Sequence, residues 1–441
     1  MFYIIETKEQ LQHLPKDENS FIHIVSSNSN YHPKGNSVSL LYYRSSEKGY
    51  ILAVNHSESF SLDINDISEF LLSHKKLYCL DKKYTSYFIN TDNIVDINFI
   101  IMDQENQMID LDCDTLVHRE YYRRYYYETG INKIIPISKH YEKCECLYEK
   151  VKGYIGLETD DNIYDELISE YKKVEEKGIL IDEKVFDKHF EPTWKPYSIQ
   201  DNLIHTYYNL YNLTGRPTNT FNGINFLAIN KDNKSRESFY PLNDMFIEFD
   251  FDGYHLRLIA NIIGFELDNK ESIHTILGRE YFKKQDITEE EYQQSKAITF
   301  KQIYGGINKE YEYIEFFNQI KNFITILWDN YNTDGYIKMP TGRILHKNKM
   351  VDINPQKLFN YLIQNLETKS NVHILKEINE VLQSTSSFIS LIVYDSFLID
   401  FSINDKKDIL LKIKNIINKN NLTAKIKYGK NYHLMVKTNY L

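Results

Sequence analysis

The sequence predicts a chain of mixed α and β structure, with a small α/β domain first and an α+β region in the second half. Three observations predict this. Short β-rich runs alternate with polar turns between residues 21 and about 101. A charged stretch with helical periodicity follows at about 141–177, and the second half alternates short strands with long amphipathic helices. A length of 441 residues allows about three domains.

The composition is that of an ordinary soluble globular protein, at 42% hydrophobic and 26% charged residues. This excludes a disordered tail, a collagen-like rod and a small disulfide scaffold. The net charge of −10 means that any polyanionic partner must be held by local basic surface. The 36 tyrosines and 24 phenylalanines are attributed to an A/T-rich coding genome, so no function is inferred from them.

The sequence also predicts a soluble, intracellular protein. It contains no uncharged apolar run long enough to span a bilayer, and its first residues lack the pattern of a signal peptide. The four cysteines contain no C-x-x-C pair, which argues against zinc and fits a reducing compartment. They are Cys79, Cys113, Cys144 and Cys146.

The N-terminal α/β domain is predicted from three successive β-rich runs at 21–25, 38–43 and 49–54. A helical stretch near 67–73 follows them. The charged periodic stretch at 141–177 is interpreted as a solvated helical connector.

The first segment with functional potential is a strand predicted at 245–252, followed by a helix after Gly253. Strand alternation places Glu248, Asp250 and Asp252 on one face, opposite the apolar residues. A carboxylate between a strand and a helix can bind a metal ion or act as a general base. Taken alone, however, the pattern is more often a cluster of solvated carboxylates.

The second segment is a helix at 292–304 that ends at two glycines. Residues spaced by four line one of its faces, and these are Tyr292, Lys296, Phe300 and Tyr304. A lysine among aromatic side chains suits a phosphate and a stacked base. Taken alone, the pattern more often marks core aromatics with a snorkelling lysine.

The third segment is a predicted hairpin at 390–401, with Tyr394, Asp395 and Ser396 at its tip. Asp395 could be a simple turn residue. If its strand pairs with the strand that ends at Asp250, however, the two carboxylates meet. Such a pair could hold two Mg²⁺ ions and support an in-line displacement at phosphorus.

In this order, the three segments resemble motifs A, B and C of the family A (polymerase I-like) DNA polymerases. Motif A is matched by Asp250 with His255-Leu256-Arg257, motif B (K-x-x-x-F/Y-x-x-x-Y-G) by 296–305, and the motif C hairpin by 394–396. Further matches are Thr214-Gly215-Arg216, His274, the pair Asn360 and Gln364, and Gly335-Tyr336 with Gly342-Arg343. The resemblance covers about 178–441 and depends on the joint order of the motifs.

The resemblance implies a right-hand polymerase with palm, fingers and a reduced thumb, preceded by an α/β RNase H-like domain of the exonuclease type. The implied regions are a degenerate exonuclease-like domain at 1–135, a connector with the reduced thumb at 136–215, and the palm with fingers at 216–441. The fingers would lie at about 267–335.

The resemblance also implies roles for single residues. Asp250, Asp395 and the carbonyl of Phe251 would bind two Mg²⁺ ions, and Lys296 would protonate the leaving pyrophosphate. The implied nucleotide-binding residues are His255, His274, Tyr292, Phe300 and Tyr304. The implied DNA-binding residues are Arg216, Asn360, Gln364 and Tyr394, although Arg216, Asn360 and Gln364 could instead be surface or packing residues.

The motifs depart from the family pattern at three places. His255 replaces the glutamate that excludes a 2′-hydroxyl, so the rule for sugar selection cannot be carried over. Tyr292 replaces a triphosphate-binding arginine, for which Lys301 is a candidate substitute. In motif C, Tyr394 and Ser396 replace the histidine and glutamate that flank Asp395.

Whole regions depart as well. Only about 34 residues separate Asp182 from Arg216, so the thumb is expected to be short and processivity poor without a partner. The exonuclease metal motifs are replaced at 25–28 and near 81–85, which predicts no hydrolysis by that route. The first domain could also be an unrelated α/β domain.

Two basic segments could contact nucleic acid, or could simply be solvated. Residues 406–437 contain nine lysines and one acid, Asp408, and Arg119, Arg123 and Arg124 lie beside a run of tyrosines.

The expected function is extension of a primer 3′-end with deoxynucleotides by a two-metal DNA polymerase without proofreading. The expected partners are primer-template DNA, dNTPs and a processivity or replisome protein, with no membrane. The expected location is the cytoplasm, that of a bacterial host if the protein is phage-encoded. Two alternatives stay open, namely a polymerase that accepts ribonucleotides and a non-catalytic scaffold that binds primer-template.

Overall fold

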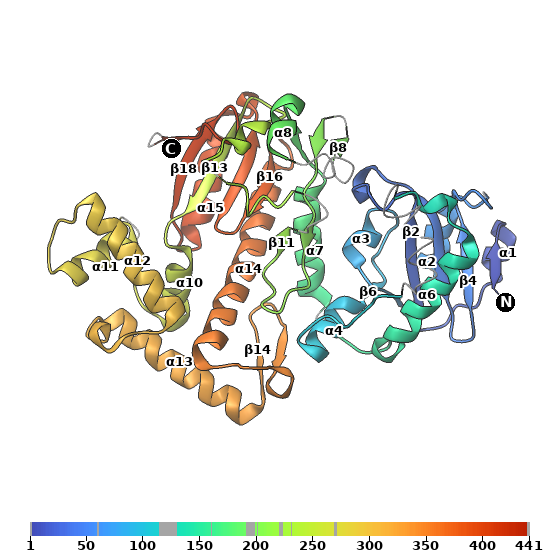
Figure 1. The fold of residues 1–441 in the computed structure, drawn as a ribbon, viewed down its shortest axis with the longest axis horizontal. Helices are drawn as coiled ribbons and strands as arrows, with labels where there is room; N and C mark the ends of the chain where they lie inside the picture. Colours follow the sequence, from blue (N-terminus) through green and yellow to red (C-terminus); the bar gives the residue numbers. More distant parts are fainter. Residues whose placement is uncertain are drawn as a thin grey trace. The chain divides into compact units, whose positions relative to one another are not determined.

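The structure is a computed structural model that forms two compact units (Figure 1). It describes residues 2–59, 61–113, 130–159, 161–190, 199–200, 202–219, 224–230, 232–268 and 271–438. The first unit comprises Met1–Lys172, Glu191–Tyr207 and Thr220–Ile224, and the second comprises Lys173–Phe190, Tyr208–Asn219 and Asn225–Leu441. The basic segment at 119–127 lies outside the described residues.

A six-stranded mixed sheet forms the centre of the first unit, in the order β1-β4-β3-β2-β5-β6. Strands β2, β3 and β4 are antiparallel neighbours and confirm the three predicted runs, while β1, β5 and β6 add parallel pairs. In chain order the strands are β1 Tyr3–Ile5, β2 Ser20–Ser26, β3 Val38–Arg44, β4 Gly49–Ala53, β5 Leu77–Cys79 and β6 Ile94–Asp96.

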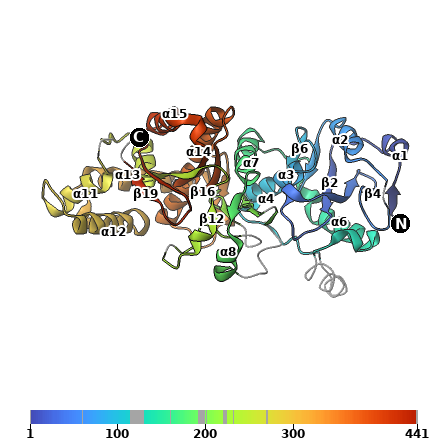
Figure 2. The ribbon, with the colours of Figure 1, turned by 90° about the horizontal axis from the view of Figure 1, so that it is seen from above.

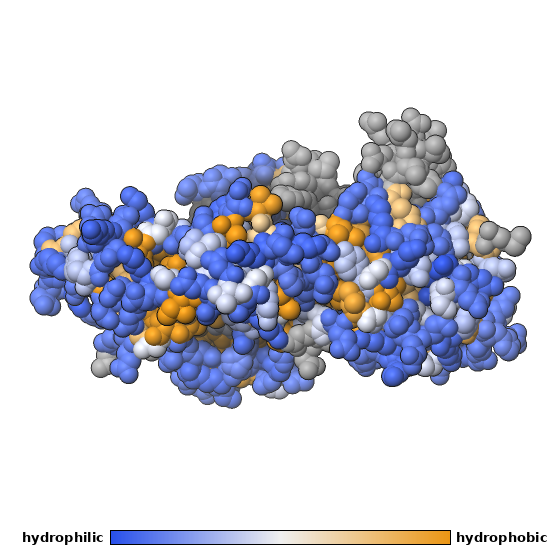
Figure 3. All heavy atoms as spheres, turned by 90° about the horizontal axis from the view of Figure 1, so that it is seen from below, coloured by the Kyte–Doolittle hydropathy of each residue, from blue (hydrophilic) through white to orange (hydrophobic). Residues whose placement is uncertain are grey.

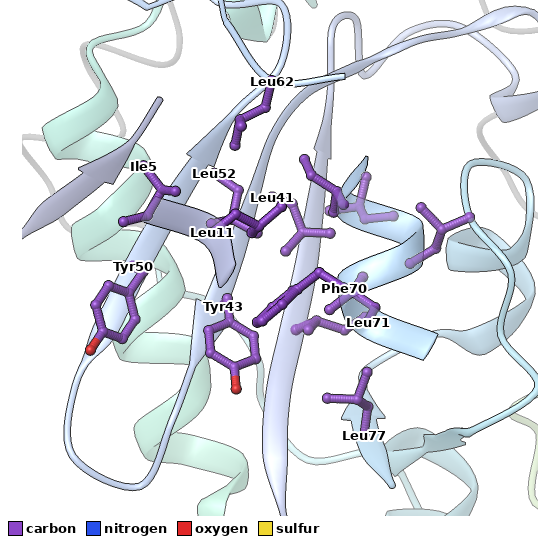
Figure 4. Close-up of a cluster of buried hydrophobic side chains, with 14 of the residues drawn as sticks. Ile5, Leu11, Leu41, Tyr43, Tyr50, Leu52, Leu62, Phe70, Leu71 and Leu77 are labelled. Carbon is purple, nitrogen blue, oxygen red and sulfur yellow. The ribbon is translucent and has the colours of Figure 1, made fainter. Parts of the chain in front are cut away.

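One face of this sheet packs against α1 (Lys8–Gln12) and α2 (Ile64–Leu72). Side chains such as Leu41 and Phe70 point toward one another between the strands and the helix (Figure 4). Helix α2 was predicted near 67–73. It begins earlier because the Asp63 side chain accepts a hydrogen bond from the backbone of Asn65 and caps the first turn.

The opposite face packs against α4 (Ile97–Glu105) and α6 (Ile137–Val151), around Leu40, Tyr42 and Leu147. The predicted connector at 141–177 is two helices, since a short 3₁₀ turn after α6 separates it from α7. The remaining elements are α3 Lys82–Ser86, α7 Asp161–Glu175, β8 Ile199–Gln200 and β9 Leu203–Ile204. Cys113 and Cys146 form a disulfide. This differs from the reducing compartment that the sequence predicted.

The second unit contains a five-stranded antiparallel sheet in the order β16-β17-β13-β18-β19. The strand predicted at 245–252 is its central strand β13, and the hairpin predicted at 390–401 is β16 and β17. The bounds are β13 Met245–Phe251, β16 Phe388–Val393, β17 Ser396–Phe401, β18 Ala424–Gly429 and β19 Val436–Thr438.

Helices α10 to α14 share one hydrophobic cluster around residues such as Leu256, Ile303 and Phe317, and α11 to α13 extend away from the sheet (Figure 1). Figure 2 shows the same helices from above. The helices are α8 Glu183–His189, α10 Tyr254–Ile263, α11 Ile273–Phe282, α12 Glu289–Gly305, α13 Glu315–Asp334, α14 Pro355–Leu382 and α15 Lys406–Lys419. Short strands complete the unit: β7 Ile179–Ile181, β10 Tyr208–Asn209, β11 Thr218–Asn219, β12 Phe239–Tyr240, β14 Tyr336–Lys338 and β15 Ile344–His346.

The surface seen in Figure 3 is mostly hydrophilic, with apolar atoms in separate patches. Across the described residues, no helix combines the length and the apolarity that crossing a membrane requires.

Candidate active site

The site begins where β13 ends. Buried Phe246 and Phe249 anchor β13 in the core, and Asp250 lies opposite Ser396 of β17. The next backbone N–H, of Phe251, donates to the carbonyl oxygen of Asp395 at 2.8 Å. The strands therefore pair as the carboxylate hypothesis required, and Asp250 and Asp395 lie at the same end of the sheet.

The turn that carries Asp395 has an unusual backbone. Val393 pairs with Ser396, so Tyr394 and Asp395 form the turn, and Tyr394 has φ 52°. An aromatic residue in this left-handed region needs support from its surroundings. Asn371 supplies it by donating to the Tyr394 carbonyl at 3.2 Å, and the guanidinium of Arg216 lies 3.8 Å from the Tyr394 ring centre.

A cavity of about 310 Å³ opens beside these carboxylates in the second unit. Ten of the thirteen predicted site residues line it, namely Arg216, Asp250, Phe251, His255, His274, Lys296, Phe300, Tyr304, Tyr394 and Asp395. Residues from five separate parts of the chain thus meet at one cavity.

Three predicted residues do not line the cavity. The Tyr292 hydroxyl lies close to it and accepts a hydrogen bond from Lys425 at 3.2 Å. Asn360 donates to the carbonyl of Tyr304 at 3.2 Å and so ties α14 to the end of α12. Gln364 is half-buried and lies outside the cavity lining. Lys301, the proposed arginine substitute, is exposed and also lies outside the lining.

The carboxylates carry the electrostatic character expected of a cation site. Burial, and then the nearby charge of Asp250, raise the pKa of Asp395. The ammonium of Lys427, on β18, lies 2.8 Å from Asp250 and 2.7 Å from Glu248. The carboxylates therefore already attract a positive charge from the protein itself.

Asp250, Asp395 and the Phe251 carbonyl present oxygen atoms at the cavity, the type of ligand that Mg²⁺ prefers. Among the described residues no group of three or more His, Cys, Asp or Glu side chains could hold a metal ion. Two carboxylates and the Phe251 carbonyl leave the other positions to water and phosphate oxygens, which is how Mg²⁺ is usually bound.

A buried glutamate that the sequence analysis missed connects two walls of the cavity. Glu367, on α14, accepts from Arg216 at 3.0 Å through one oxygen and contacts Nε2 of His255 at 2.5 Å through the other. A carboxylate can only accept, so Nε2 carries the proton. Nδ1 of His255 then contacts the Tyr304 hydroxyl at 2.6 Å. No local motif marks Glu367, which lies 112 residues from His255.

Two lysines were missed in the same way. Lys425 and Lys427 are two apart on β18, so both project from one face of the strand toward the carboxylates. Lys425 lies 2.7 Å from Asp252. Burial opposes ionisation of Asp252, but Lys425, together with Ser272 and His274, lowers the pKa of this carboxyl. Alternating lysines within the basic C-terminal segment are the signal that could have found them.

His274 faces the cavity as a neutral imidazole. It is 2% exposed, and its Nδ1 has no hydrogen-bond partner among the described residues. Burial lowers its pKa to about 4; Asp252 favours the charged form, while Lys296 and Lys425 oppose it. The ring also meets Phe300 edge-on, with ring centres 5.6 Å apart.

We predict that His274 makes the protein less stable in acid. Its pKa is about 4 when folded and near 6.5 when unfolded, so the unfolded chain binds the proton first as pH falls. The stability that neutral His274 contributes is complete above about pH 6.5 and is lost toward pH 4, by up to about 3 kcal/mol. Thermal unfolding of His274→Gln should therefore change less with pH than that of the wild type.

His373 provides the control, because it lies exposed on α14. His373→Gln should follow the wild-type pH dependence. An equal decline in wild type and His274→Gln would contradict the neutral buried imidazole.

Comparisons with known proteins identify the fold of this chain. No protein-family model matches the sequence. No curated protein matches it either. Among solved structures, the chain is similar to the POL domain of Pol1 from M. smegmatis in complex with DNA primer-template and dNTP, with a TM-score of 0.70 and 12% sequence identity. The match covers 99% of this chain and 100% of that one. The chain therefore has a polymerase-like fold.

Proposed function

We propose that the protein is a template-directed DNA polymerase of the family A type. The observation that carries this proposal is the meeting of Asp250 and Asp395 at one end of an antiparallel sheet, in a cavity shared with Lys296 and Phe300. The polymerase-like fold supports it, and the similar M. smegmatis domain is described with primer-template and dNTP.

In the proposed reaction, the primer 3′-hydroxyl attacks the α-phosphorus of a dNTP and pyrophosphate leaves. Asp250, Asp395 and the Phe251 carbonyl would hold two Mg²⁺ ions, which when bound lower the pKa of the attacking hydroxyl and neutralise charge on the leaving group. Lys296 binds the triphosphate and donates a proton to the leaving pyrophosphate. Phe300 and Tyr304 pack against the nucleotide.

The choice between deoxyribose and ribose would fall to His255. Its ring is held between Tyr304 and Glu367, so it presents a fixed surface to the cavity. A ribonucleotide-accepting polymerase stays the alternative, because a histidine stands where the family has its selecting glutamate.

The first unit is proposed to be an exonuclease-like domain without nuclease activity. At the end of β2 a cavity of about 270 Å³ is lined by residues that include Ser26, Tyr84 and His140. Among the described residues that line this cavity none is an Asp or Glu, and the reaction needs carboxylates to hold metal ions.

The proposed regions remain the exonuclease-like domain at 1–135, the connector with thumb at 136–215 and the palm with fingers at 216–441. Between Asp182 and Arg216, the residues that the structure describes contain one α-helix, the seven-residue α8. A thumb that depends on this one short helix would grip duplex product only weakly, which supports a need for a processivity partner.

We predict that the purified protein extends a labelled primer on a template with Mg²⁺ and dNTPs, and leaves the primer undegraded when nucleotides are omitted. Extension products should be short at limiting enzyme, because a reduced thumb releases DNA early. The measurement is gel analysis of the primer with dNTPs, with rNTPs and with neither.

Each outcome separates the competing functions. Equal use of rNTPs would favour the ribonucleotide-accepting alternative. Binding of primer-template without extension, even with a replisome extract, would favour the scaffold. Shortening of the primer would contradict the inactive exonuclease-like domain.

A further inference from the structure

A triphosphate carries several negative charges, and few cations of this cavity are available to meet them. Among the described residues, the lysine and arginine side chains that line the cavity are Arg216, Lys296 and Lys425. Arg216 is already engaged by Glu367 and lies on the ring of Tyr394. Lys425 also has a partner, Asp252, but 41% of its side chain is exposed, against 23% for Arg216. Lys296 and Lys425 are therefore the cations best placed to face an anionic ligand.

Lys425 is placed by the sheet itself. Strand β18 pairs with β13, so that Lys425 lies opposite Asp250. Its ammonium lies 2.7 Å from Asp252 and 3.2 Å from the Tyr292 hydroxyl, and 41% of its side chain stays exposed. The two contacts fix the ammonium without enclosing it, so it can still bind a ligand.

Two features bring Lys425 and Lys296 to the same end of the cavity. Tyr292, which Lys425 contacts, lies one helical turn before Lys296 on the same face of α12. His274 lies close enough to both lysines that their charges help to keep its imidazole neutral. A neutral His274 can donate or accept a hydrogen bond at the same place without adding charge.

We propose that Lys425 is a second triphosphate-binding residue, which together with Lys296 holds the β- and γ-phosphates of the incoming nucleotide. This inference rests on the proposed polymerase function. Asp252 serves as the counter-ion that keeps Lys425 extended and charged before the nucleotide binds. Lys425 occupies the role for which Lys301 was the candidate by sequence, and the Tyr292 side chain orients it.

The test compares Lys425→Met with Lys301→Ala in primer extension by the full chain. Lys425→Met keeps most of the length of the side chain and removes its charge. We expect it to raise the KM for dNTP about tenfold or more, and to weaken inhibition by inorganic pyrophosphate by a similar factor. Its Kd for primer-template should stay within about twofold, because the contact is to the nucleotide. Lys301→Ala should change none of the three.

Two further variants guard against a folding defect. Lys425→Arg keeps the charge and should hold the KM within about threefold of the wild-type value. Lys425→Met combined with Asp252→Asn removes both charges, so no buried carboxylate is left unpaired, and it should keep the raised KM.

The failures are distinguishable. A wild-type protein that extends no primer overturns the proposed function, and this inference with it. A wild-type protein that extends primers, while Lys425→Met keeps its KM and its pyrophosphate inhibition, overturns the inference alone. A raised KM in Lys301→Ala but not in Lys425→Met would also overturn it.

Discussion

Replacing Asp395 by asparagine is expected to abolish primer extension, with a loss in kcat of at least about a thousandfold, or about 4 kcal/mol of transition-state stabilisation. The amide keeps the shape of the side chain but removes the charge that would hold a metal ion at the end of the sheet. Asp250→Asn should cause a loss of similar size. The measurement is single-turnover extension at saturating dNTP.

The same substitution should not harm folding. Burial and the neighbouring Asp250 raise the pKa of Asp395, so its ionised form costs free energy in the folded protein without metal ions. Removing that charge should leave the Tm of metal-free protein unchanged or raised, as is common where function opposes stability.

Asp400, also on β17, gives the opposite control. It is buried and accepts hydrogen bonds from the backbone N–H groups of Leu242 and Asn243 at 2.5 and 2.9 Å. Asp400→Asn would point an amide donor at one of these donors. We expect it to lower the free energy of unfolding by about 1–3 kcal/mol, and the Tm with it, while kcat is largely retained. Full activity in Asp395→Asn would contradict the site assignment.

Replacing Glu367 by alanine is expected to have the second large effect. The Glu367 side chain is 2% exposed and connects Arg216 to His255. Without it, the partly buried Arg216 loses its partner and the His255 proton loses its acceptor, which should cost about 2–4 kcal/mol of stability. The positions of His255 and Tyr304 should loosen as well, so we expect a higher KM for dNTP and weaker discrimination against rNTP.

Glu377 is a matched control on the same helix, α14. It pairs with Lys419 at 2.6 Å and its side chain is 20% exposed. Glu377→Ala should lower the free energy of unfolding by less than about 1 kcal/mol and leave the KM for dNTP unchanged, because ion pairs that are more solvated contribute little to stability. Thermal unfolding and steady-state kinetics of both variants measure the difference. Similar effects from both would show that Glu367 has no special place in the site.

The elements with strong periodicity could be predicted from the sequence. Apolar and polar residues alternate at 245–252 because β13 is a central strand, paired with β17 and β18, and packs its apolar side chains into the core. The four residues spaced by four on α12 do share a face, with Lys296, Phe300 and Tyr304 on the cavity. Prediction was less accurate where local contacts set the ends of a helix. The Asp63 cap starts α2 earlier than predicted, and the turn after α6 separates two helices that periodicity alone predicted as one stretch.

The sequence by itself determined which residue types this site contains, because the proposed chemistry at phosphate needs carboxylates, a lysine and a stacking ring, and these stand in order along the chain. Only the tertiary structure decided which of them meet and what completes them. Glu367 carries no local signature, and the alternation of Lys425 and Lys427 does not reveal what they contact, since the partners of all three lie more than 100 residues away. They enter the site because antiparallel pairing of β18 with β13 and the packing of α14 bring them there, and a buried charge is stable only beside such a partner.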